Sequence, residues 1–140
     1  MTEYADLTPY RYQTEWLDWW RRLGLRNVGW LGRQVPFATG DTPVRVRDAL
    51  VRLADEPVEV MRGFHACELC RRKPPIYVDA VDGSDEQVML GTGEIRVWGR
   101  LPRRYAAPTL IVHYIDEHRY MPPREFCDAV LRVADRHGWP

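Results

Sequence analysis

Two cysteines separated by two residues, Cys67 and Cys70, constrain the fold of this chain more than any other feature. The CxxC spacing lets two thiolates turn toward one tetrahedral metal ion at about 2.3 Å each. Further along the chain, His113 and His118 have the x4 spacing that occurs in zinc-finger helices. A metal ion bound by all four would bring distant segments together. The pattern therefore predicts one structural zinc ion with the ligands Cys67, Cys70, His113 and His118.

The choice of the fourth ligand is open between His118 and His65, which stands two residues before Cys67. On an ideal helix His113 and His118 are about 140° apart, so their joint ligation requires the last helical turn to tighten or fray. Residues before Pro122 are pushed out of the helical region, which lets the backbone bend there. We favour His118 and keep His65 in reserve.

Two alternative roles for the CxxC have less support. Covalent haem attachment needs a histidine directly after the second cysteine, where this chain has Arg71. A thioredoxin-type redox pair should open a helix in a βαβ pattern, whereas this pair precedes Arg-Arg-Lys-Pro-Pro. The alternative to a metal site is that the cysteines are small buried hydrophobes and the histidines ordinary polar residues. We expect Cys127 to pack in the core and His137 to face solvent.

Helix signals occur in four segments. Trp16, Trp19 and Trp20 fall on one face of the first segment, and a Pro-containing opening precedes each of the others. The expected helices run from Thr14 to Gly24, from Thr42 to before Pro57, from Pro108 to about His118, and from Pro122-Pro123 onward, where Phe126, Val130, Leu131 and Ala134 face inward.

Strand signals are shorter. We expect strands at residues 58–64, 76–78, 87–90 and 94–98, and an ordered loop at 25–41. Gly91-Thr92-Gly93 is a three-residue loop of the kind that closes a hairpin between the last two strands. The prediction is an α+β fold in a single domain, residues 1–140, in which a zinc knuckle and hairpin pack on a C-terminal helix pair and an N-terminal Trp-rich helix.

Charge and hydropathy exclude some classes of function. The chain has 20 basic and 20 acidic side chains, so no overall charge attracts it to nucleic acid or membranes. No apolar run approaches the roughly 20 residues that span a bilayer. The start, MTEYADLTPY, has no signal-peptide pattern, so we expect a cytoplasmic protein. Nucleic-acid binding then requires a local basic patch, for which the candidates are Arg71, Arg72, Lys73, Arg100, Arg103 and Arg104.

No common catalytic motif is present: the sequence contains no HExxH, GxGxxG, P-loop or GxSxG, and no zinc-deaminase pattern. If the zinc were catalytic, the candidate general bases would be Glu94, Asp116 and Glu117. We expect instead a structural zinc in a protein-interaction module. The alternatives are a nucleic-acid-binding zinc domain and a zinc-dependent enzyme.

Several phrases of the sequence also carry a resemblance. DLTPYRY, NVGWL, VPFATG, RGFHACELC, LGTGEIRVWG and YAAPTLIVHYIDEHRYMPPREF resemble those of a family of small actinobacterial proteins of unknown function. The likeness runs along most of the chain. The family's recurring HxCxxC and HY…H…PP pattern implies a shared site at His65, Cys67, Cys70, His113 and His118.

Overall fold

The computed structural model describes residues 3–10 and 24–140. Within them the chain forms three helices and five strands in mixed order, so the expected α+β fold class is confirmed. The predicted Trp-rich helix falls on residues 11–23, outside the described residues. Among the described helices, none is both long and apolar enough to cross a membrane.

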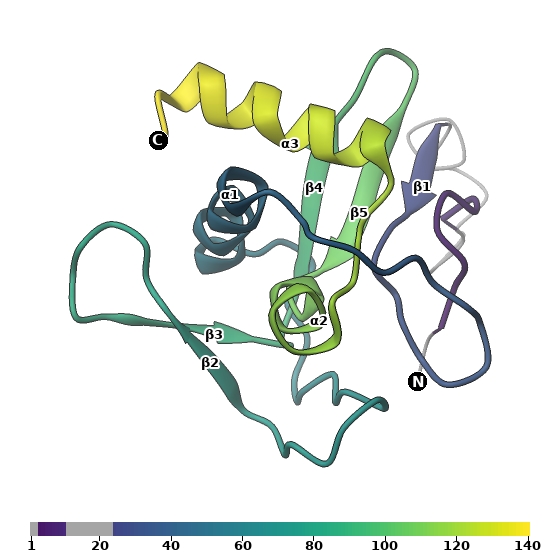
Figure 1. Ribbon diagram of the computed structural model, residues 1–140, viewed down its shortest axis with the longest axis vertical. Helices are drawn as coiled ribbons and strands as arrows, with labels where there is room; N and C mark the ends of the chain where they lie inside the picture. The colour runs from purple at the N-terminus through teal and green to yellow at the C-terminus, as the bar shows by residue number, and fades with distance from the viewer. Residues whose placement is uncertain (1–2, 11–23) are drawn as a thin grey trace.

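A three-stranded sheet forms the centre of the fold (Figure 1). Its order is β1 (Leu25–Asn27), β5 (Arg104–Pro108) and β4 (Glu94–Trp98). β5 is antiparallel to β4 and parallel to β1. The sequence prediction of a loop at 25–41 is therefore wrong for β1, because three residues are too few to show an alternating pattern and only pairing with β5 defines the strand.

A second sheet is a two-stranded antiparallel ribbon of β2 (Ile76–Asp79) and β3 (Gln87–Leu90). It projects away from the main sheet at the lower left of Figure 1. The predicted strands at 76–78 and 87–90 are thus confirmed. Alternation along the strands buries one side of the ribbon against the core, through Ile76, Val88 and Leu90.

The predicted hairpin between residues 87–90 and 94–98 is wrong, although both segments are strands. β3 pairs with β2, and β4 pairs with β5. Gly91-Thr92-Gly93 instead carries the chain from one sheet to the other. The Gly91 N–H donates to Thr109 Oγ1 at 2.8 Å, and the Thr109 N–H donates to the Gly93 carbonyl at 3.0 Å. Each strand pairs along its whole length with another partner, which outweighs the local preference of a short glycine loop.

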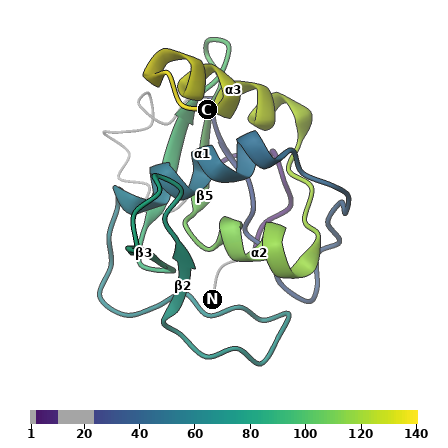
Figure 2. The ribbon, with the colours of Figure 1, turned by 60° about the vertical axis from the view of Figure 1, so that its left-hand side comes forward.

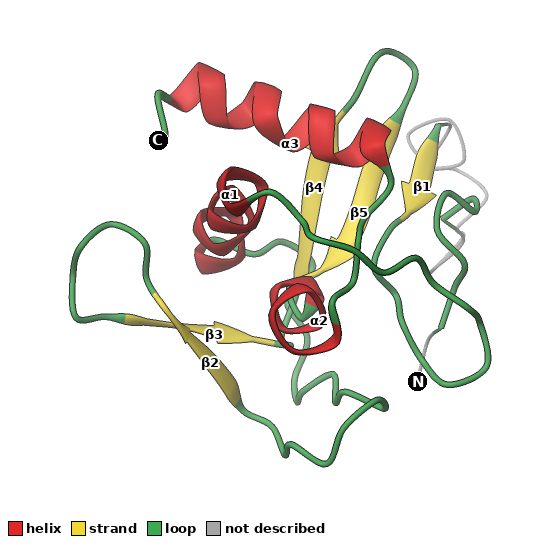
Figure 3. Cartoon of the chain, viewed as in Figure 1, coloured by secondary structure: helices red, strands yellow, loops and turns green. Residues whose placement is uncertain are grey.

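Helices α1 (Val44–Asp55) and α3 (Arg124–His137) pack against each other, and both contact β4. Figure 3 shows α3 passing in front of β4 and β5, and α1 below α3, to the left of β4. Each follows a proline at its N-cap, Pro43 or Pro123, so the predicted helix openings are confirmed to within a residue. Their buried faces carry apolar residues that the periodicity predicted: Val46, Ala49, Leu50, Phe126, Val130 and Ala134.

Helix α2 (Ile111–His118) begins three residues later than predicted. Pro108 is the last residue of β5, opposite Glu94, where its missing N–H is tolerated at the strand end. The strand predicted at 58–64 is also wrong. In that segment Val58 alone forms a bridge, with Glu94, and Glu59 has a left-handed φ of 50° that interrupts an extended chain.

Candidate metal centre

Four side chains from two separate segments meet at one point. The sulfur atoms of Cys67 and Cys70 and ring nitrogens of His113 and His118 all lie within 4.8 Å of one another. Cys67 Sγ is 3.4 Å from His118 Nε2, and Cys70 Sγ is 3.4 Å from His113 Nε2. On a tetrahedral zinc ion with ordinary bond lengths, sulfur and nitrogen ligands are about 3.6 Å apart. The geometry therefore fits a tetrahedral ion.

The cysteines lie in the loop that leads into β2. The loop is attached to the end of β3, because the His65 N–H donates to the Gly91 carbonyl at 2.7 Å. Gly91 has a φ of 95°, and a side chain there would meet the His65 carbonyl at 3.0 Å, so glycine is required for this approach. The Leu69 N–H donates to Cys67 Sγ at 3.4 Å, as a backbone turning around a metal-bound thiolate does.

The histidines come from the two ends of α2. His113 is buried, and His118 is the last residue of the helix. Arg119 then adopts a left-handed conformation with φ 52°, and the Tyr120 N–H donates back to the Tyr114 carbonyl at 3.1 Å. The helix therefore runs through His118 and ends directly after it, and both histidine rings still reach the cysteines. The two imidazole rings come within 5.1 Å of each other, centre to centre.

Burial shifts the pKa of two side chains of this cluster, Cys67 and His113. It raises the pKa of the Cys67 thiol, while the Leu69 N–H acts in the opposite direction. Burial also lowers the pKa of His113, and a positive charge on His118 would lower it further. The His113 imidazole is thus held in the neutral form that binds metals, and a metal must displace the proton of the Cys67 thiol.

A comparison with family models identifies the chain's relatives. The model of a domain of unknown function, DUF7919, matches residues 2–131. The chain belongs to the DUF7919 family. Membership of a family of unknown function, expected from the resemblance, is confirmed, while the recurring pattern and the actinobacterial origin stay predictions. Searches among curated proteins and among solved structures give no significant match.

The other predicted site residues of this DUF7919 domain lie outside the cluster. The His65 ring stacks on Trp30 with 5.9 Å between centres. Cys127 is buried, with Sγ 3.7 Å from the Pro122 carbonyl, so its predicted core position is confirmed. His137 is exposed, as predicted.

The three candidate general bases are engaged elsewhere. Asp116 pairs with Arg47 at 2.8 Å, and Glu117 lies 3.5 Å from Arg72. Glu94 is buried in the main sheet, where it accepts a hydrogen bond from the hydroxyl of Tyr10 at 3.1 Å. No spacing in the sequence signals this pair, because its members are 84 positions apart. None of the three carboxylates joins the cluster within the described residues.

The six basic residues predicted to form a patch divide into two groups. Residues 71–73 follow the CxxC at one end of the molecule, whereas the turn that holds Arg100 and Arg103, and Arg104 at the start of β5, lie at the opposite end (Figures 1 and 2). Arg103 lies 3.8 Å from Glu125, and Arg104 stacks over Trp98 at 4.9 Å. The two groups therefore do not converge. Nucleic-acid binding stays a prediction without a common basic surface.

Proposed function

We propose that this DUF7919 domain binds one zinc ion through Cys67, Cys70, His113 and His118, and that the ion is structural. The observation that carries the proposal is the approach of each sulfur to a ring nitrogen at 3.4 Å. A tetrahedral set of two sulfurs and two nitrogens is typical of zinc or of an iron–sulfur cluster. The sulfur–nitrogen distances of 3.4 Å fit a single ion better than a cluster, which favours zinc.

A structural role follows from the completeness of the ligand set. Four protein ligands fill a tetrahedral zinc and leave no position for a water or a substrate. The acids closest in sequence to the histidines, Asp116 and Glu117, are paired with arginines instead. The ion would fasten the loop at residues 62–75, which has no helix or strand of its own, to α2 (Figure 2).

Elemental analysis of the purified full chain tests the proposal. We expect one zinc per chain in the wild type and close to none in Cys67→Ser or His113→Ala. Cys127→Ala is the matched control, because it removes a buried thiol that is outside the cluster and should keep the zinc. A folded wild-type protein without metal would contradict the proposal.

We further propose that residues 58–64, which lead into the loop that zinc would fasten, contact another protein. Just before the CxxC, a run of apolar side chains is exposed to solvent, and such patches mark interaction surfaces: Val58 at 44%, Val60 at 63%, Met61 at 50% and Phe64 at 43%. The segment is held against the core, since the Met61 N–H donates to the Thr92 carbonyl at 2.8 Å. Its side chains are thus presented on a fixed backbone.

Photo-crosslinking in cells tests this contact. A photoreactive residue placed at Val60 should give a discrete protein adduct that disappears when the zinc ligands are replaced. The matched control is Val44, which is 72% exposed at the start of α1 and lies outside the segment. Equal adducts at both positions, or none at Val60, would contradict a protein contact here. Binding of nucleic acid, the alternative, would weaken steeply with added salt.

A further inference from the structure

A cavity of about 320 Å³ lies between the residues before the CxxC and the N-terminal segment. We propose that it binds an organic ammonium group. The inference does not depend on the proposed zinc or on the protein contact. The side chains that carry it are four aromatic rings and two carboxylates: Tyr4, Tyr10, Trp30, His65, Glu59 and Glu94.

The aromatic walls are already in place. Tyr4 meets Trp30 edge-on with 6.3 Å between ring centres, and His65 stacks on Trp30 at 5.9 Å. The Trp30 Nε1–H donates to the Ala106 carbonyl at 2.9 Å, which fixes the indole. The Tyr4 N–H in turn donates to the Trp30 carbonyl at 3.0 Å. A cage of fixed aromatic faces binds a cation with little loss of conformational freedom.

The charges of the cavity also suit a cation. Among the described residues that line it, the ones with a formal charge are both acids, Glu59 and Glu94. Glu94 is 7% exposed, and alternation along β4 puts it on the same face as Arg96. Burial raises the pKa of Glu94 even though Arg96 lies 3.1 Å from its carboxylate. A bound cation would supply the compensation that Arg96 leaves incomplete.

The contact of Arg96 with Tyr10 shows the same chemistry within the chain. Its guanidinium lies over the Tyr10 ring at 4.8 Å while it pairs with Glu94. A ring face and a buried carboxylate therefore already hold one cation beside the cavity. Arg96 does not line the cavity itself. The aromatic walls that stay partly exposed are Tyr4 and His65, because Trp30 is only 7% exposed and lies against the stacked His65 ring. A second cation would therefore contact these two rings.

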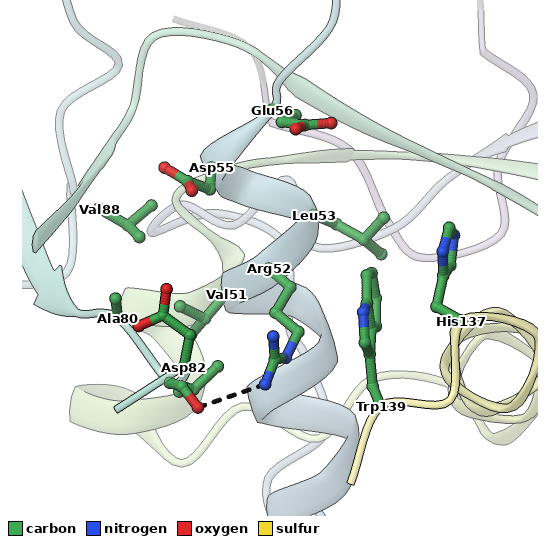
Figure 4. A pocket seen from close by; sticks show the side chains of 11 residues that line it. Val51, Arg52, Leu53, Asp55, Glu56, Ala80, Asp82, Val88, His137 and Trp139 are labelled. Atoms are coloured by element: carbon green, nitrogen blue, oxygen red, sulfur yellow. Dashed lines mark hydrogen bonds between the residues drawn. The ribbon is translucent and has the colours of Figure 1, made fainter. Parts of the chain in front are cut away.

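Another cavity, of about 390 Å³, lies beside α1 (Figure 4). Its largest aromatic side chain, Trp139, already has a cation over its ring. There Arg52 donates to the Val81 carbonyl at 3.3 Å and lies over the Trp139 ring at 5.6 Å. His137 stacks on the same ring at 4.6 Å. Arg52 thus already supplies a cation to Trp139, whereas the described residues that line the cavity at Glu59 and Glu94 include no Lys or Arg, which makes that cavity the better ammonium site.

The volume sets the size of the ligand. It falls at the lower end of the roughly 300–1,000 Å³ typical of small-molecule pockets, so a single alkylated ammonium group fits better than a larger compound. Such a group occurs both in free small molecules and on alkylated lysine side chains. The shared chemistry is a soft, weakly hydrated cation that stacks on aromatic rings.

Titration of the purified full chain with choline tests the inference. Proton–nitrogen correlation spectra should show a saturable shift of the Trp30 indole, assigned with Trp30→Phe. Dimethylbutanol, the neutral carbon isostere of choline, should bind about tenfold more weakly. Capped trimethyllysine is the second arm: tighter binding than choline indicates a lysine side chain as the natural ligand, and weaker binding indicates a free small molecule. Equal binding of choline and its isostere, or binding of neither, overturns the proposal.

Variants place the binding in this cavity. Tyr4→Leu and Glu59→Gln should each weaken choline binding several-fold. Glu94→Gln should weaken choline binding further. This change also leaves Arg96 without its carboxylate partner. If Glu94→Gln does not fold for that reason, Glu59→Gln still provides the test. Glu56→Gln, an exposed acid of the cavity beside α1, is the control and should bind like the wild type. Unchanged binding in Tyr4→Leu and Glu59→Gln would overturn the assignment. Zinc content measured on each sample separates this outcome from failure of the metal site.

Discussion

Withdrawal of zinc should remove a large part of the stability of the fold. The ion would join the CxxC loop to α2 across the 43 positions that separate Cys70 from His113. In the chain-entropy treatment, a cross-link that closes a loop of this length restricts the unfolded state by about 4 kcal/mol. Measured values for structural zinc in peptides are higher, about 10–16 kcal/mol. Since whole domains are stable by only about 5–15 kcal/mol, even the lower figure is a large share.

The lower figure converts into a melting temperature. Unfolding entropies average about 2.1 cal/mol/K per residue, so for 140 residues a loss of 4 kcal/mol lowers Tm by about 14 °C. Circular dichroism melts near neutral pH, with and without a zinc chelator, measure the change. Zinc added back in excess should restore the Tm. Cys67→Ser should melt at the lower temperature and ignore the chelator, whereas Cys127→Ala should respond to it like the wild type.

Two outcomes would refute this reasoning. The first is a chelated sample that has lost its zinc, by elemental analysis, and keeps its Tm within a few degrees. The ion would then not link the loop to α2. The second is a Cys67→Ser variant with the wild-type Tm and the wild-type response to the chelator. That result would remove Cys67 from the ligand set.

Three further predictions concern the fourth ligand, a buried acid and the core. His118→Ala should lose far more zinc affinity in a competition titration than the roughly 10- to 100-fold expected of a residue that only supports a ligand, while His65→Ala should stay within that range; the reverse order would make His65 the ligand. Burial raises the pKa of Glu94 above its ordinary 4.5, so the native state binds more protons than the unfolded state above that pH. Wild-type stability in urea should therefore fall relative to Glu94→Gln as pH rises above 4.5 and level off once the native carboxyl has ionised, and a difference independent of pH would contradict this. Phe126→Ala should cost about 3–5 kcal/mol in urea unfolding because the ring is fully buried and meets Tyr105 edge-on, whereas Val44→Ala on the exposed start of α1 should cost little; similar losses in both would contradict the packing.

Local pattern was enough to predict several parts of the structure. Apolar periodicity behind a proline predicted α1 and α3, since a helix buries residues three and four apart on one face wherever it packs. Short apolar runs bounded by turn residues likewise predicted the strand segments 76–78, 87–90 and 94–98. The Cys and His spacings predicted Cys67, Cys70 and His113 as members of the cluster and favoured His118 over His65 as the fourth, because CxxC and H-x4-H have few geometric ways to meet one ion.

The residues before the cysteines were harder to predict. Val58, Val60 and Phe64 alternate like a strand, but the left-handed φ of Glu59 breaks the extended chain and leaves these side chains exposed. Proline often stands at the first position of a helix, yet Pro108 ends β5. In both cases the local sequence permits two conformations, and contact with β4 selects one of them. Val58 forms a bridge with Glu94, and Pro108 lies opposite the same residue.

The sequence by itself determined the helical faces and the spacings within the CxxC and H-x4-H pairs, because both depend on residues that are close in the chain. Only the tertiary structure decided the pairing of β3 with β2 and of β4 with β5, the parallel strand β1, and the separation of the two groups of basic residues. It also brought His118 rather than His65 to the cysteines and placed Tyr10 beside Glu94. These features depend on contacts between residues that are distant in sequence. The free energies of such contacts depend on how the whole chain packs, so they produce no periodic pattern in the sequence.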